Sequence, residues 1–129
     1  TAIGLKQVDQ QQVGRYQAPE QQAVDYKVIE YSGVDDTTTQ ANVTNSSGTL
    51  YGVVIESANS SDNVSVHLFD AADTSASQIT FKGLASSTKV YQIPTGYAFT
   101  QLNFWVSKLS TATDTTSFAG NVTVRLVCS

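Results

Sequence analysis

Few side chains in this sequence could carry catalysis. His67 is the only histidine and Cys128 the only cysteine among the 129 residues. Nucleophilic catalysis needs a nucleophile, a base and a group that orients the base, and nothing in the sequence places such partners around His67, which stands between Val66 and Leu68. We expect His67 to face solvent or an interface, and we expect no catalytic residues. A small hydrolase that depends on His67 or Asp70 is the enzymatic alternative.

Paired carboxylates are the second possible source of chemistry. Asp35 and Asp36 are adjacent, and Asp70 and Asp73 lie close together in the chain. Two acids can act together in a glycosidase or can bind calcium, but neither pair belongs to a D-x-D-x-D-G calcium loop. Asp is also a common turn residue, because its side chain accepts hydrogen bonds from its own backbone. We therefore interpret all four as turn residues and expect no metal and no cofactor.

The composition excludes further classes of site. A single cysteine allows neither an internal disulfide nor a cysteine zinc site, so we expect Cys128 to be an inert small side chain, with an intermolecular disulfide as the alternative. The eight glycines are isolated and form no phosphate-binding loop. The seven Lys and Arg residues are dispersed, and the formal net charge is −4. We expect no nucleic-acid partner and no polybasic membrane contact.

Aromatic residues on predicted strands are the best candidates for binding. Tyr51 and Trp105 fall on strands where other residues already occupy the core face, so they can point outward. Tyr and Trp are favoured at protein interfaces, and they can also contact a sugar ring. We expect an oligomer interface that includes Tyr51, Phe69, Trp105 and Val127. A carbohydrate- or receptor-binding site is the alternative, and its residues would be Tyr91, Tyr97 and Trp105.

The pattern of apolar residues predicts β-strands from residue 23 onward. Residues 50–55 are nearly all apolar, as in a strand buried on both faces, and residues 64–69 alternate, as in a strand with one face on a core. Turns are predicted at residues 32–36, 45–48 and 57–62. Pro94 has no N–H and is expected to end a strand. The predicted strands cover residues 24–31, 37–44, 50–55, 64–69, 78–84, 89–93, 101–107 and 121–128.

About eight short strands, with no convincing helix after residue 22, indicate an all-β fold: an antiparallel, jelly-roll-like β-sandwich. The segment 37–44 is poorly hydrophobic and is expected at a sheet edge. The last strand is strongly apolar, so it is expected in the middle of a sheet. The residues of the last two strands predicted to point inward are Leu102, Phe104, Val106, Val122, Val124, Leu126 and Cys128.

Residues 1–22 differ from the rest of the chain. Seven of them are Gln, apolar residues are sparse, and Pro19 interrupts any helix beyond a short one at residues 5–12. We interpret residues 1–22 as an extended N-terminal arm and residues 23–129 as the β-sandwich domain. The arm is either a frayed terminus or a segment that becomes ordered on a neighbouring subunit. In the second case its contact residues would be Leu5, Val8, Val13 and Tyr16.

Several segments carry a likeness to a known family. They are a G-x-L-Y-G-apolar strand at 48–55, a strand ending in L-F-D-A at 64–71, an I-P-x-G strand end at 91–96, an aromatic stretch at 97–99, the segment 102–107, and a V-T-V-x-apolar strand at 122–126. In this order they resemble small structural proteins of tailed bacteriophages. The resemblance spans residues 45–128 and contains no catalytic motif. The Gln-rich start and the segment 37–44 depart from the pattern.

The resemblance implies a β-sandwich virion component, such as a capsid decoration (cement) protein or a subunit of a head fibre or tail. We expect a non-enzymatic protein that is made in the host cytoplasm and then binds and stabilises the lattice of the major capsid protein on the capsid surface. A homo-oligomer, with a trimer implied by the resemblance, would multiply weak contacts. The second hypothesis is a carbohydrate- or receptor-binding module of a phage fibre or tail.

Overall fold

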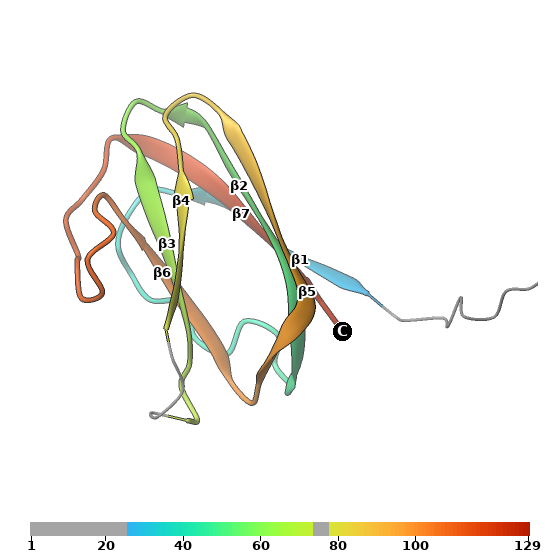
Figure 1. Cartoon of the computed structure of the whole chain (residues 1–129). Helices are drawn as coiled ribbons and strands as arrows, with labels where there is room; N and C mark the ends of the chain where they lie inside the picture. Colours follow the sequence, from blue (N-terminus) through green and yellow to red (C-terminus); the bar gives the residue numbers. More distant parts are fainter. Residues whose placement is uncertain (1–25, 74–77) are drawn as a thin grey trace, which may run out of the picture.

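The computed structural model describes residues 26–73 and 78–129, which form seven β-strands and no helix (Figure 1). The strands are β1 (Lys27–Val34), β2 (Gly48–Ser60), β3 (Val64–Asp70), β4 (Ile79–Gly83), β5 (Thr88–Phe99), β6 (Leu102–Ser107) and β7 (Gly120–Cys128). No helix in these two ranges could therefore cross a membrane. The predicted arm at residues 1–22 lies outside the described residues.

The strands form two antiparallel sheets that pack face to face (Figure 1). The larger sheet has the order β1-β7-β2-β5, and the smaller sheet has the order β4-β3-β6. The apolar last strand, β7, lies between β1 and β2, as expected for a strand in the middle of a sheet. The predicted all-β sandwich is confirmed.

The pairing is that of a jelly roll in which one strand is reduced. In a jelly roll the first strand pairs with the last, and the successive pairs nest inside. Here β1 pairs with β7, β2 with β5 and β3 with β4. The remaining partner of β6 is the segment 37–44, where Gln40 forms a single bridge with Phe104 and the Val43 N–H donates to Leu102 O at 2.9 Å. The segment 37–44 thus lies at a sheet edge, as predicted, but it is too weakly paired to be an eighth strand.

Side chains that point between the sheets form the core. Strand β7 buries every second residue, whereas β6 buries every residue except Trp105. The inward residues predicted for these two strands are all buried, which confirms them. Each apolar side chain of this size stabilises the fold by about 1.5–3 kcal/mol when fully buried. The fully buried apolar residues that β2 and β3 add to the core are Leu50, Val53, Ile55, Val64, Val66 and Leu68.

Two predicted turns are shorter than expected. The turn at 32–36 is wrong at its start, because β1 continues to Val34 through an irregular register in which Gly33 adopts a φ of 67°. The turn at 57–62 is wrong as well, because β2 continues to Ser60. Serine is acceptable inside this strand since its hydroxyl is satisfied: Ser57 Oγ donates to Leu84 O at 2.7 Å, and Ser60 Oγ donates to Ala119 O at 2.9 Å.

Pro94 does not end its strand. Strand β5 continues to Phe99, but its ladder with β2 is irregular: Gly52 pairs with Gln92, whereas Leu50 pairs with Tyr97. The residues between Gln92 and Tyr97 therefore bulge away from the ladder, which accommodates a residue without an N–H. The prediction that the chain leaves the ladder at Pro94 is right, and the prediction that the strand stops there is wrong.

Candidate functional site

The residues predicted to form an interface lie on two opposite faces of the sandwich. Val127 and Tyr51 lie on the outside of the four-stranded sheet, where Tyr51 packs edge-on against Tyr26 with 5.4 Å between ring centroids. Phe69 and Trp105 lie on the outside of the three-stranded sheet. Leu5, Val8, Val13 and Tyr16 lie outside the described residues. The structure therefore does not bring the predicted interface residues onto one surface.

The outside of the four-stranded sheet carries an apolar patch that we call the valine face, formed by Val28, Val54, Val90 and Val127. Val28 is the cross-strand partner of Val127, and Val54 is the partner of Val90. The exposed fractions of Val28 and Val90 are 61% and 64%, and both residues lie on edge strands of the sheet. Edge strands with exposed apolar side chains are open to further pairing and docking.

The charges on the valine face are paired with one another. Arg125 lies beside Val54 in the ladder. Its guanidinium donates to Glu56 Oε1 at 2.9 Å and lies 3.5 Å from Glu30 Oε2. All three side chains are partly exposed, so the pairs contribute little to stability. Arg125 thereby offsets one of the two carboxylate charges beside the apolar residues, which lowers the cost of covering this face.

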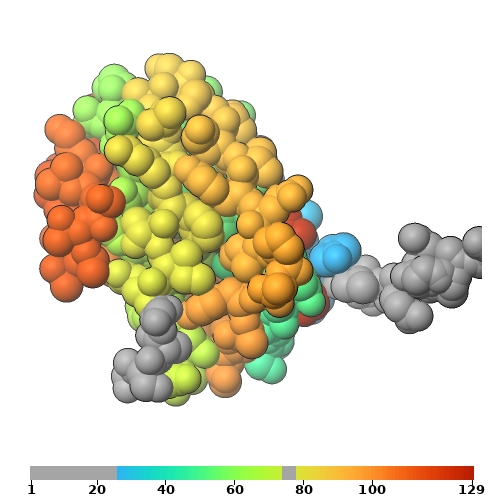
Figure 2. All heavy atoms as spheres, in the orientation of Figure 1, coloured from blue at the N-terminus to red at the C-terminus, as the bar shows by residue number. Residues whose placement is uncertain are grey.

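His67 is buried, so the prediction that it faces solvent or an interface is wrong. Its side chain does point to the outside of the three-stranded sheet, but the connection between β6 and β7 covers it. That connection forms the ridge drawn in orange at the left of Figure 2. The His67 ring stacks on Trp105 with 4.4 Å between centroids and 9° between planes, and no part of the residue is exposed. Burial lowers the pKa of His67 from its ordinary value of 6.5.

His67 and Ser107 form a contact that superficially suggests a catalytic pair. His67 Nε2 lies 2.7 Å from Ser107 Oγ. Ser107 Oγ also lies 3.0 Å from Leu109 O. When the serine proton is donated to that carbonyl, Nε2–H is the donor in the contact with His67. A general base would have to accept that serine proton instead. Both residues are also completely buried, so no substrate can reach them and the pair has a structural role.

Asp70 and Cys128, two further candidates for chemistry, have structural roles too. The Asp70 carboxylate accepts hydrogen bonds from the N–H groups of Gln101, Thr100 and Ala72, which lower the pKa of Asp70. The first two bonds fix the turn between β5 and β6. Cys128 is buried in the core, and burial raises the pKa of its thiol to about 11. Across residues 26–73 and 78–129, no group of three His, Cys, Asp or Glu side chains could hold a metal ion.

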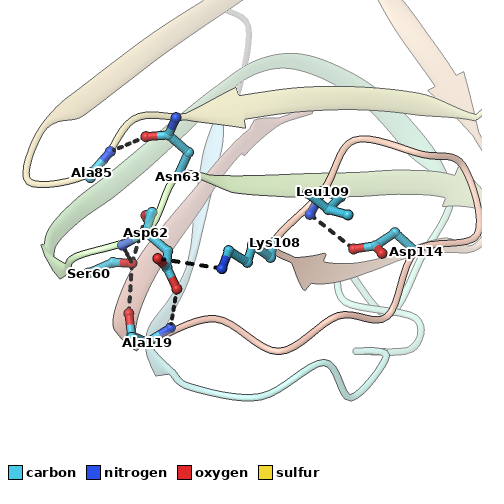
Figure 3. A network of polar contacts seen from close by, with 8 residues as sticks. All are labelled: Ser60, Asp62, Asn63, Ala85, Lys108, Leu109, Asp114 and Ala119. Carbon is cyan, nitrogen blue, oxygen red and sulfur yellow. Dashed lines mark hydrogen bonds and ion pairs between the residues drawn. The ribbon is translucent and has the colours of Figure 1, made fainter.

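One end of the sandwich is fixed by a network of polar contacts (Figure 3). The Asp62 carboxylate accepts a hydrogen bond from the Ala119 N–H at 2.9 Å and lies 3.9 Å from Lys108 Nζ. Asn63 Oδ1 accepts a hydrogen bond from the Ala85 N–H at 2.9 Å. These bonds tie the turn between β2 and β3 to the β4–β5 and β6–β7 connections. The network therefore positions the loop that covers His67.

The outside of the three-stranded sheet contains a groove of about 600 Å³. Trp105 and Phe69 line it from β6 and β3, and Thr37 and Thr39 line it from the segment beside β6. The β6–β7 connection contributes Ala112, Thr113 and Thr115. Sequence analysis identified the two aromatic residues but missed the threonines. The only signal for Thr113 and Thr115 was a Ser- and Thr-rich loop downstream of the single tryptophan, and Thr37 and Thr39 had none.

The aromatic residues predicted as a carbohydrate site do not converge. Trp105 lines the groove. Tyr91, on β5 of the four-stranded sheet, instead packs against the core and Phe81 of β4, and it donates its hydroxyl proton to Lys82 O at 2.6 Å. Tyr97 is half-buried against the core. A shared platform made of Tyr91, Tyr97 and Trp105 is therefore not present.

Comparison with known proteins provides no identification. No model of a known protein family matches this chain. No curated protein matches it either.

Proposed function

We propose that this protein is a non-enzymatic structural component of a tailed-phage particle, a capsid decoration or cement protein that docks through the valine face. The observation that carries the proposal is the exposure of Val28 and Val90 on the two edge strands of one sheet. The jelly-roll fold, which is common among viral capsid domains, and the resemblance to small phage structural proteins support the same class.

The valine face has the properties of a docking surface. Its apolar side chains cross all four strands of the sheet, from Val28 on β1 through Val127 and Val54 to Val90 on β5. Adjacent strands lie about 4.8 Å apart, so the face is about 14 Å wide. Covering apolar area contributes about 25 cal/mol per Å² before the costs of association. One such face gives a weak contact.

Two further features would strengthen that contact. Residues 1–25 directly precede the first described residue, Tyr26, whose exposed fraction is 57%. An arm that leaves the sheet beside Val28 can extend the contact on the same partner, through Leu5, Val8, Val13 and Tyr16. Binding as a closed homo-oligomer, expected to be a trimer, and in many copies would then turn weak contacts into stable decoration of the major capsid protein lattice.

The test is binding of the purified protein to phage capsids that lack it. We expect saturable decoration visible by electron microscopy, and a trimer in sedimentation analysis. The double variant Val28→Lys/Val90→Lys should bind at least about tenfold more weakly, a loss of about 1.4 kcal/mol. Leu109→Lys is the matched control, since Leu109 is 51% exposed but lies away from the valine face.

Each measurement in this test has an outcome that contradicts the proposal. Equal binding by the double variant and the control would mean that the valine face is not the docking surface. Absence of decoration by the wild-type protein would remove the capsid role itself. A chain without residues 1–22 that decorates capsids as tightly as the full chain would show that the arm makes no contact.

A further inference from the structure

The groove on the three-stranded sheet lies on the face opposite the valine face. Its aromatic surface comes from Trp105 and Phe69, which pack edge-on with 5.7 Å between ring centroids. Both residues are half-buried, so part of each ring remains open to the groove. A groove of about 600 Å³ falls within the range of small-molecule sites.

The indole of Trp105 is held in a fixed orientation. His67 stacks on one face of the ring, and the indole N–H donates to Asp114 O at 2.8 Å. Contact with a ligand therefore comes from the other face of the ring or from its edge. Because no rotation of the indole is needed on binding, little conformational entropy is lost there.

The loop that forms one wall of the groove is fixed as well. The Asp114 carboxylate accepts hydrogen bonds from Leu109 N–H at 3.0 Å, from Thr116 N–H at 3.2 Å and from the Thr116 hydroxyl at 2.6 Å. These donors, the Thr116 hydroxyl first among them, lower the pKa of Asp114 to about 2, so the carboxylate stays charged at neutral pH. The neighbouring residues Thr113 and Thr115 are thereby presented to the groove on a rigid turn.

The polar side chains around the groove select the class of ligand. Four threonines and Gln78 supply hydroxyl and amide groups that can donate and accept hydrogen bonds. The charged residues that line the groove are Asp70 and Asp73, and no Lys or Arg lines it within the described ranges. An anionic ligand such as a phosphate, a sulfated sugar or a sialic acid would meet negative charge without a cation to balance it.

We propose that this groove binds a neutral saccharide. A pyranose ring has an apolar face of C–H groups, and the partial positive charge of their hydrogens complements the negative face of an aromatic ring. Its hydroxyls are both donors and acceptors, which matches the threonine, amide and carboxylate groups of the rim. This site lies on the opposite face from the proposed capsid contact, so a docked protein would still present it outward.

Binding can be measured through Trp105 itself, since it is the only tryptophan of the chain. The full chain is first screened on an array that carries neutral and anionic glycans. Neutral hits are then titrated as free oligosaccharides, which do not absorb at the excitation wavelength, while the indole emission is recorded. We expect a saturable change in emission with at least one neutral oligosaccharide and none with sulfated or sialylated ones.

Two loop variants locate the site. Ala112 is exposed, lines the groove and lies in the turn closed by the Asp114 N–H to Thr111 O bond of 2.9 Å, a position that tolerates most residues. Ala112→Arg should fill the groove and weaken binding at least about tenfold, equal to about 1.4 kcal/mol. Ser117→Arg is the matched control, because Ser117 is exposed on the same connection but does not line the groove.

Three results would overturn the saccharide site: no neutral glycan bound, anionic glycans bound in preference, or equal affinity for Ala112→Arg and Ser117→Arg. The result is independent of the proposed function. Ala112→Arg should leave capsid decoration unchanged, and Val28→Lys/Val90→Lys should leave saccharide binding unchanged. Failure of either proposal can therefore be recognised separately.

Discussion

Replacing His67 by alanine tests whether its ring is the buried support of Trp105. The ring is completely buried, stacks on the indole at 4.4 Å and contacts Ser107 Oγ at 2.7 Å. Truncating a large buried side chain to alanine costs about 2–5 kcal/mol. Losing the aromatic stack costs about 0.5–1.5 kcal/mol, and losing the hydrogen bond costs a similar amount. Because one deletion removes all three contributions and they overlap, we expect the free energy of unfolding to fall by about 3 kcal/mol.

Two further variants separate these contributions. His67→Phe keeps a ring against Trp105 and loses the hydrogen bonds, so we expect a loss of about 1 kcal/mol. Thr80→Ala is the control: Thr80 is exposed, its contact with His67 Nδ1 is 3.4 Å long, and its removal should change stability by less than about 0.5 kcal/mol. Urea unfolding, followed by Trp105 emission and by circular dichroism, gives the free energies. A loss below about 1 kcal/mol for His67→Ala would contradict the packing described.

Acidification, overpacking and thiol modification give three more tests. The free energy of unfolding should fall as pH decreases below about 6.5, because burial lowers the pKa of His67 and the unfolded chain therefore takes up the proton first. Urea unfolding at a series of pH values below 6.5 measures this fall, and the His67→Phe variant should lack the contribution of His67. Gly83→Ala should cost about 1–3 kcal/mol, since its Cβ would lie 2.6 Å from Ile55 Cγ2 and 3.0 Å from Val64 Cγ2; an unchanged Tm would contradict this packing. Cys128 is buried with its pKa raised to about 11, so maleimide should label it only on unfolding, and rapid labelling of the native protein would contradict its burial.

Alternation of apolar residues predicted the strands that have one face on the core. Strand β7 and most of β6 follow this rule, and their inward residues could be named from the sequence. The rule failed where other contacts replace hydrophobic burial. Ser57 and Ser60 continue β2 because backbone carbonyls accept their hydroxyl protons, and β5 passes Pro94 through a bulge. The distant acceptors have no signal in the local sequence, and Pro94 marks the bulge without indicating that the strand resumes after it.

The surfaces were harder to predict than the core. Alternation placed the side chain of His67 on the outside of its sheet, which is correct, but it contains no information on the loop that covers this position. The groove shows the same limit. Trp105 was predicted to point outward, whereas the threonines beside it come from residues 37–39 and 113–115, which only the tertiary fold brings together. Val28 and Val90 were missed because an exposed valine on a strand looks like a core residue in the sequence.

Amide hydrogen exchange on the assembled particle tests the central claim most directly, namely that the valine face is the surface that docks. The protein is compared free in solution and bound to capsids. We predict slower exchange on binding in peptides that cover β1 and residues 88–92 of β5, with no change at residues 110–117 around the groove. Slower exchange around the groove with none in β1 and β5 would place the contact on the opposite face and contradict the account.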